Sequence, residues 1–150
     1  RLSTTCMTTS RTISKIEDLI PQRSPIMMVD ELLDVVDTEC TCCLEVRSDN
    51  YFMEDDGQLA EPGVIEHIAQ SASAFAGYIA TSQGATKPPV GYIGEVKNFC
   101  LKRRPKLGEV LMTQICMGAT IGGVTIISAS TQVLDEVIAE TQMKIFVRED

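Results

Sequence analysis

Hydrophobic residues follow two different periods along the chain. From Pro62 to about Gly84 they recur at helical spacing, and small residues fill many of the positions between them. A proline in the first turn suits a helix start, because the N–H group that it lacks would have no partner there. The pattern predicts one long, buried helix that ends near the breaker GATKPP at residues 84–89.

Beyond this breaker, hydrophobic and polar residues alternate with a period of two, which is typical of strands. We expect a series of strands here, rich in β-branched residues, with a tight turn at Asp135 and Glu136 before the last one. Their predicted ranges are Val90–Leu101, Glu109–Met117, Gly123–Leu134 and Val137–Val147.

The segment before the long helix predicts a short helix and two further strands. The short helix spans Ser14–Ile20, where Ser14 and Glu17 have the spacing of a capping box, and Pro21 ends it. An acidic loop at residues 50–60 then leads into the long helix. The two strands are predicted at Ile26–Val36 and Cys40–Val46.

This order of elements predicts an α+β fold, in which an antiparallel sheet covers one apolar helix. Such a sheet leaves its edge strands open, so we expect dimerisation by edge pairing. A chain of 150 residues is of the size of one domain. We expect the polar residues 1–12 to form a disordered tail and residues 13–150 to form a single domain.

Composition excludes several classes of function. The net charge of −8 argues against a general nucleic-acid binder, and no apolar run is long enough to cross a bilayer. The N-terminal residues lack the apolar core of a secretory signal. With one histidine in the chain we expect no metal site, and we expect the six cysteines to be free thiols in a cytoplasmic protein.

The single histidine, His67, follows Glu66 directly on the long predicted helix. Adjacent helical residues point about 100° apart, so these two side chains cannot face one small pocket. Glu66 instead shares a helix face with Gln70 and Ser73. Two interpretations of Glu66 remain open: a functional carboxylate, or an acidic residue in the first turn that the helix dipole favours.

Several sequence segments match the motifs of one known enzyme family, in order. The family's Leu-Pro-His-Arg opening is matched by LIPQRSPIMMVDELLD, and its central helix by PGVIEHIAQSASA. Its strand-turn motif is matched by NFCLKRRPKLGEVL, and its closing hairpin by VLDEVIAETQMKIFV. The chain therefore resembles the 3-hydroxyacyl-[acyl carrier protein] dehydratases. Their hotdog fold is a curved antiparallel sheet wrapped around a long central helix, and it is usually dimeric.

The resemblance implies loss of water from a 3-hydroxyacyl thioester carried on acyl carrier protein, without a cofactor. Glu66 falls on the carboxylate that protonates the departing hydroxyl group. Gly63 and Val64 fall on the turn that binds the thioester carbonyl, and Gln70 falls on the helix glutamine. A helix N-terminus suits a carbonyl on which negative charge develops, and an apolar tunnel raises the pKa of a carboxyl group.

The chain departs from this family where the catalytic base is expected. The loop before the helix, MEDDGQLAEPG, contains no histidine, and Gln22 replaces the histidine of the opening motif. The same loop resembles that of a divergent branch of hotdog dehydratase-like proteins, whose members accompany polyketide or aryl-polyene synthesis. His67 is a candidate base, with packing or a dimer contact as the alternative. Asp55 and Asp56 are further candidates, with a solvated acidic turn as the alternative.

Basic residues gather between positions 97 and 106, including Lys102, Arg103 and Arg104. Acyl carrier proteins are acidic and carry a phosphopantetheine phosphate, so this patch could bind one. The alternative is a solvated turn that keeps a sheet edge soluble.

The sequence supports three hypotheses. The first is an active dehydratase, and the second is a hotdog thioesterase in which Glu66 activates water or attacks the thioester. The third is a non-catalytic subunit that binds acyl carrier protein or pairs with an active dehydratase. The expected assembly is a homodimer, a higher homo-oligomer or a heterodimer with a related dehydratase.

Overall fold

A computed structural model describes residues 15–84, 86 and 90–148. The expected tail at residues 1–12 lies outside these residues, as does Ser14. The elements are η1 (Ile16–Asp18), β1 (Glu31–Val36), β2 (Glu39–Glu45), α1 (Glu61–Ser82), β3 (Val90–Leu101), β4 (Val110–Ile121), β5 (Val124–Val133) and β6 (Glu136–Arg148).

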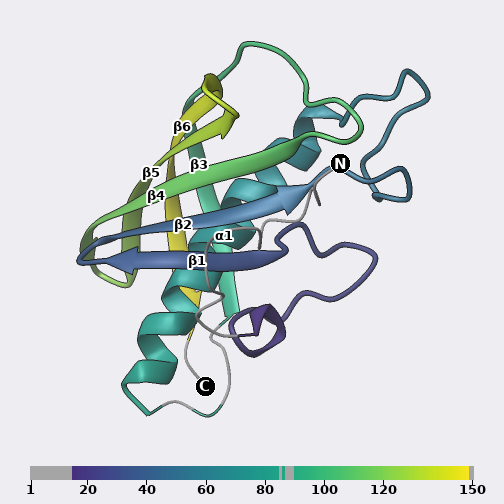
Figure 1. Cartoon of the computed structure of the whole chain (residues 1–150). Helices are drawn as coiled ribbons and strands as arrows, with labels where there is room; N and C mark the ends of the chain where they lie inside the picture. The colour runs from purple at the N-terminus through teal and green to yellow at the C-terminus, as the bar shows by residue number, and fades with distance from the viewer. Residues whose placement is uncertain (1–14, 85, 87–89, 149–150) are drawn as a thin grey trace.

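The strands form one antiparallel sheet of six strands, in the order β1-β2-β4-β5-β6-β3. The sheet curves around α1, and β1, β2 and β4 cross in front of this helix in Figure 1. The predicted α+β fold and its hotdog arrangement are therefore confirmed. β1 and β3 are the two edge strands of the sheet in the described part of the chain.

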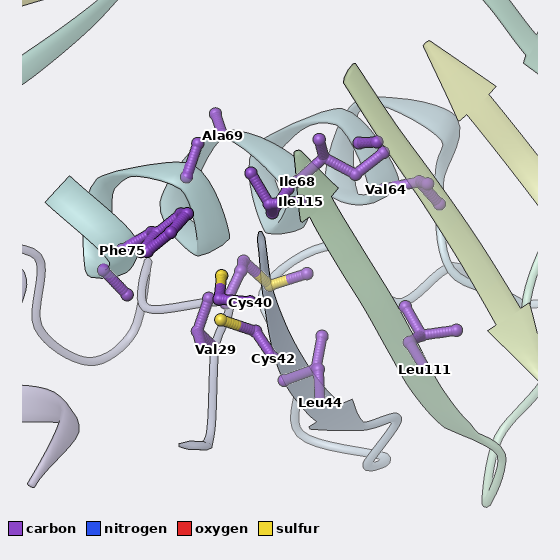
Figure 2. Close-up of a cluster of buried hydrophobic side chains, with 14 of the residues drawn as sticks. Val29, Cys40, Cys42, Leu44, Val64, Ile68, Ala69, Phe75, Leu111 and Ile115 are labelled. Carbon is purple, nitrogen blue, oxygen red and sulfur yellow. The ribbon is translucent and has the colours of Figure 1, made fainter. Parts of the chain in front are cut away.

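The core lies between α1 and the concave face of the sheet. Figure 2 shows Val64, Ile68 and Phe75 of the helix opposite Leu111 and Ile115 of β4. All five side chains have no exposed surface. Full burial of one large apolar side chain contributes about 1.5–3 kcal/mol, so this helix–sheet contact is a main source of stability.

Two glycines of α1 allow other segments to approach the helix closely. A Cβ atom at Gly77 would collide with the carbonyl oxygen of Leu19, which follows η1. A Cβ atom at Gly63 would lie 2.6 Å from Cβ of Phe52, in the loop before the helix. Both positions therefore require glycine for packing.

The cysteines of β2 lie on both faces of the sheet, as the alternation predicts. Cys40 and Cys42 face the helix, where Figure 2 shows their sulfur atoms close together, and Cys43 packs with Leu33 on the other face. A hydrogen bond with Cys42, together with burial, raises the pKa of Cys40, which keeps it a thiol.

The expectation of free thiols is confirmed for four cysteines and is wrong for one. Cys40, Cys42, Cys100 and Cys116 are free. Cys43 is disulfide-bonded, and its partner is not among the described residues. Residue spacing alone did not reveal this bond, because it depends on which cysteines meet in three dimensions.

Several predicted boundaries are wrong, among them the end of the strand predicted at Glu109–Met117, which continues to Ile121. The short helix is a single 3-10 turn, Ile16–Asp18, without a side-chain cap. The last turn lies at Leu134 and Asp135, where Leu134 has a φ of 54°, because Glu136 already pairs with Val133. The first strand begins at Glu31 rather than at Ile26.

The late start of β1 has a specific cause. In the preceding segment the backbone of Ile26 and Met28 forms hydrogen bonds with side chains of α1, and the first backbone bond to β2 comes from the N–H of Asp30. The apolar composition of this segment reflects burial against the helix.

Candidate active site

Glu66 lies in the second turn of α1 and is half-buried. Its Oε2 accepts a hydrogen bond of 2.9 Å from Nε2 of Gln70, which lies four residues further along the helix. This is the spacing at which helical side chains meet. The predicted polar stripe of Glu66, Gln70 and Ser73 is confirmed, since all three line one pocket.

Gln70 connects Glu66 to the segment before β1. Its Oε1 accepts a hydrogen bond of 2.6 Å from the backbone N–H of Met28, and its Nε2 donates one of 2.9 Å to the carbonyl of Ile26. Because the Met28 N–H requires an acceptor, the oxygen of the carboxamide must face Met28 and the NH₂ group must face Glu66. Both N–H bonds of Gln70 are thus in use, and its geometry orients the carboxylate.

His67 points away from this stripe, into the core. Its ring lies 2.7 Å (Nδ1) from the carbonyl oxygen of Met28 and 2.8 Å (Nε2) from the hydroxyl of Thr113. A carbonyl only accepts, so Nδ1 carries the hydrogen. Complete burial lowers the pKa of His67 to about 4, so the ring is neutral and Nε2 accepts from Thr113. The hydroxyl of Thr131, 2.7 Å away, then donates to Thr113.

This burial decides between the two structural interpretations of His67. A side chain with no exposed surface packs within its own chain, and it does not form a dimer contact or reach a second active site. The packing interpretation therefore agrees with the structure.

The pocket beside Glu66 has a volume of about 270 Å³. It is lined by Gln22, Glu66, Ala69, Gln70, Ser73, Ile93 and Ile145. Of the predicted catalytic and substrate-binding residues, the structure brings Glu66 and Gln70 together here. Gly63, Val64 and His67 are not part of the lining.

A second, larger pocket of about 440 Å³ lies along the C-terminal half of α1. Ile145 lines both pockets, and the helix residues that line them lie on α1 from Glu66 to Ala80, with Gln83 directly after its end. Most of the larger pocket is apolar. Its lining consists of Ala72, Ala76, Ile79, Ala80, Gln83, Met117, Thr120, Gly123, Thr125, Ile127 and Ile145.

Gly63 and Val64 are buried at the start of α1. The N–H of Gly63 donates a hydrogen bond of 2.9 Å to the carbonyl of Ala60. The close approach of Phe52 is a sufficient structural reason for the glycine. The carbonyl-binding role of Gly63 and Val64 stays a prediction.

The two arginines of the predicted basic patch pair with carboxylates of the same chain. Arg103 forms an ion pair of 2.9 Å with Glu109 and a second one with Glu136. Arg104 lies 2.8 Å from Asp56 and also pairs with Glu54. Lys102 is exposed and forms no ion pair with any other described residue.

The same contacts bear on the acidic loop. A hydrogen bond from Arg104 holds the pKa of Asp56 below its usual value, which makes this carboxylate a weaker base. Neither Asp55 nor Asp56 lines the Glu66 pocket.

Comparison with known proteins identifies the family. A family model described as ApeP-like, ApeP dehydratase, matches residues 14–150, which is most of the chain. The chain belongs to the ApeP-like dehydratase family. The resemblance seen in the sequence motifs is thereby confirmed, including the divergent branch. No curated protein shows a significant match.

Solved structures with low sequence identity share the fold of this chain. A chain of the dehydratase heterocomplex ApeI:P from Xenorhabdus doucetiae aligns with a TM-score of 0.84 at 16% identity, over 91% of this chain and 93% of that one. The virulence protein Cj0977 from Campylobacter jejuni aligns with a TM-score of 0.69 at 13% identity, over 92% of this chain and 91% of that one. The protein smu.793 from Streptococcus mutans, bound to acetyl-CoA, aligns with a TM-score of 0.63 at 12% identity, over 82% of this chain and 93% of that one.

The sequence predicts Glu66, Gln70 and Ser73 on one face, but it does not predict that Ile93 and Ile145 complete the pocket. Gln22 was singled out only as the replacement of a family histidine, whereas the structure brings it beside Glu66. No helix among the described residues is long and apolar enough to cross a membrane. Nor do those residues contain a cluster of three side chains suited to hold a metal ion.

Proposed function

We propose that this ApeP-like dehydratase takes part in the removal of water from 3-hydroxyacyl thioesters carried on acyl carrier protein, with Glu66 as the acid that protonates the departing hydroxyl group. The observation that carries the proposal is the position of Glu66 in a pocket that shares Ile145 with a larger, mostly apolar pocket. An acyl chain is apolar and would fit the larger pocket, whereas the polar groups at its reacting carbons would fit the pocket beside Glu66.

The hydrogen bonds of Glu66 support this role. Gln70 donates to Oε2, and Oε1 has no hydrogen bond within the described residues. Oε1 is therefore available to exchange a proton with a ligand. General acid catalysis requires such a group within hydrogen-bond reach of the leaving oxygen.

A second proton-transfer group is needed to remove the Cα proton, and the pocket lining contains no ionisable side chain besides Glu66. His67 is buried and neutral, and the Asp55–Asp56 loop lies elsewhere. We infer that the base comes from a partner subunit, in a dimer with a related dehydratase. The ApeI:P complex is a dehydratase heterocomplex, which supports such a pairing.

The edge strand β3 offers the surface for this partner. Ile93 of β3 lines the Glu66 pocket and is 38% exposed. A subunit that pairs with this edge would therefore lie beside the pocket. Lys102 at the end of this strand carries the exposed positive charge that would contribute to binding an acidic carrier protein.

The test is a mass-spectrometric assay of 3-hydroxyacyl-acyl carrier protein, with the chain alone and with a related dehydratase subunit. We expect loss of water in the mixture and a drop of at least about a hundredfold in Glu66→Gln, which is the range of general acid catalysis. Glu61→Gln, an exposed carboxylate on the same helix, is the matched control and should keep the rate.

Other outcomes identify the competing functions. Release of the free carrier thiol would identify a thioesterase instead. A mixture that loses water at the full rate with Glu66→Gln would overturn the role of Glu66 and favour a subunit that only binds or supports its partner.

A further inference from the structure

Gln22 carries an unusual atom. Its side-chain Oε1 is buried, and it is the only buried side-chain nitrogen or oxygen in the described part of the chain that has no hydrogen-bond partner. Buried polar groups in proteins are nearly always bonded, because an unsatisfied acceptor loses its bonds to water without replacement. Such an atom in a ligand pocket is a candidate for a contact that forms only when a ligand is bound.

The position of Gln22 is well defined. Arg23, its neighbour, donates hydrogen bonds of 2.7 Å to the carbonyl of Ile20 and 2.8 Å to the carbonyl of Gln22 itself. A third bond of 2.7 Å joins Arg23 to the carbonyl of Glu17. The turn that carries Gln22 is thus held on both sides, and its side chain lines the Glu66 pocket.

The other polar groups of the pocket do not supply the missing donor. Both N–H bonds of Gln70 are directed to Ile26 and Glu66, and Ser73 forms no hydrogen bond with Gln22. Among the described residues no donor reaches this oxygen, and a ligand in the pocket would supply one. On the proposed substrate, the 3-hydroxyl group is a donor at the reacting carbon, whereas the enoyl product and a saturated acyl chain have none there.

We propose that Gln22 accepts a hydrogen bond from the 3-hydroxyl group of the substrate and thereby selects hydroxyacyl chains over enoyl and saturated chains. A hydroxyl that donates to Gln22 keeps its oxygen lone pairs free to face Glu66. This inference rests on the proposed function and adds a specificity-determining residue to it.

The test measures binding rather than turnover. Two non-hydrolysable pantetheine amides, one with a 3-hydroxyacyl chain and one with the saturated chain of equal length, are titrated into the full chain in its native assembly. We expect wild type to bind the hydroxyacyl compound about five- to tenfold more tightly, the effect of one hydrogen bond. Gln22→Met, which keeps the side-chain length but lacks the amide, should bind both compounds equally.

A matched control and a second measurement keep the test decisive. Gln132→Met changes an exposed glutamine on β5 and should keep the preference for the hydroxyl group. Gln22→Met should unfold at the same or a higher temperature than wild type, because it removes an unsatisfied buried acceptor.

The experiment distinguishes a failure of the Gln22 proposal from a failure of the proposed function. If Gln22→Met retains the preference, or wild type binds both compounds equally while turnover still depends on Glu66, the role of Gln22 is refuted and the proposed function stands. If wild type binds neither compound, both are refuted.

Discussion

At the scale of single residues, His67 shows how burial sets the chemistry of a side chain. Its pKa is lowered from 6.5 to about 4 when the chain folds. Between these two values the unfolded chain binds a proton at His67 and the folded chain does not. The contribution of this residue to stability is therefore complete above pH 6.5 and is lost as the pH falls towards 4.

This difference predicts a pH dependence of folding. From about pH 7 to about pH 5, the free energy of unfolding should fall by about 2 kcal/mol more in wild type than in His67→Gln, since glutamine does not titrate. Urea unfolding curves at the two pH values measure it. If the free energy of unfolding falls equally in wild type and in His67→Gln, the assignment of a neutral His67 in the folded chain is contradicted.

The predictability of the site differs from residue to residue. The direction of Glu66 and Gln70 followed from helix geometry alone, because residues four apart share a face. In sequence, Gln22 is separated from Glu66 by the whole of β1 and β2 and by the loop before α1. Its unsatisfied oxygen depends on packing among distant segments, which no local pattern encodes.

At the scale of elements, the segment at residues 26–30 depends on α1. Gln70 bonds to the backbone at Ile26 and Met28, and His67 bonds to Met28 as well. These contacts join groups that are 39 to 44 residues apart in the chain. They replace the strand pairing that the apolar composition of this segment suggested.

Removal of the Gln70 carboxamide should therefore act on this segment. Gln70→Leu leaves the buried Met28 N–H without a partner, at a cost of about 1–3 kcal/mol, and also removes the donor of the part-buried Ile26 carbonyl. We expect a lower free energy of unfolding and faster hydrogen exchange at the Met28 amide than in wild type. Gln132→Leu, at an exposed site, should change neither, and protection of Met28 in Gln70→Leu would refute this role.

The strands and the long helix were predictable because their periods are long and regular. β3 has the predicted bounds, Val90–Leu101, and α1 differs by a residue or two at each end. The predicted start of the first strand was wrong because the backbone there bonds to distant side chains. The predicted short helix was wrong because only a single turn forms. Local pattern predicts an element only when the partners of its backbone are local or in a sheet.

At the scale of the whole molecule, β3 has an open edge whose helix-facing side is apolar. Val96 pairs with buried Met143 in register, and the paired residues of antiparallel strands share a face. Val96 is nevertheless 37% exposed, because β3 is the last strand of the sheet. This surface is available for a partner subunit.

A charge at this edge should prevent assembly. Val96→Lys should shift the dimer or heterocomplex towards single chains in light scattering, with little loss of stability of the single chain. Ile126→Lys is the control, since Ile126 is similarly exposed, at 45%, but lies on the outer face of β5 beside Lys144. If both variants assemble like wild type, β3 is not the interface.

The chain of hydrogen bonds from Ile26 and Met28 through Gln70 to Glu66 has a consequence for ligand affinity. These bonds close when the protein folds, so the rotational freedom of the carboxylate is lost then and not when a ligand arrives. A disturbance that loosens residues 26–30 without unfolding the sheet would restore that freedom. It would weaken ligand binding at temperatures where the spectroscopic signature of the fold is still intact.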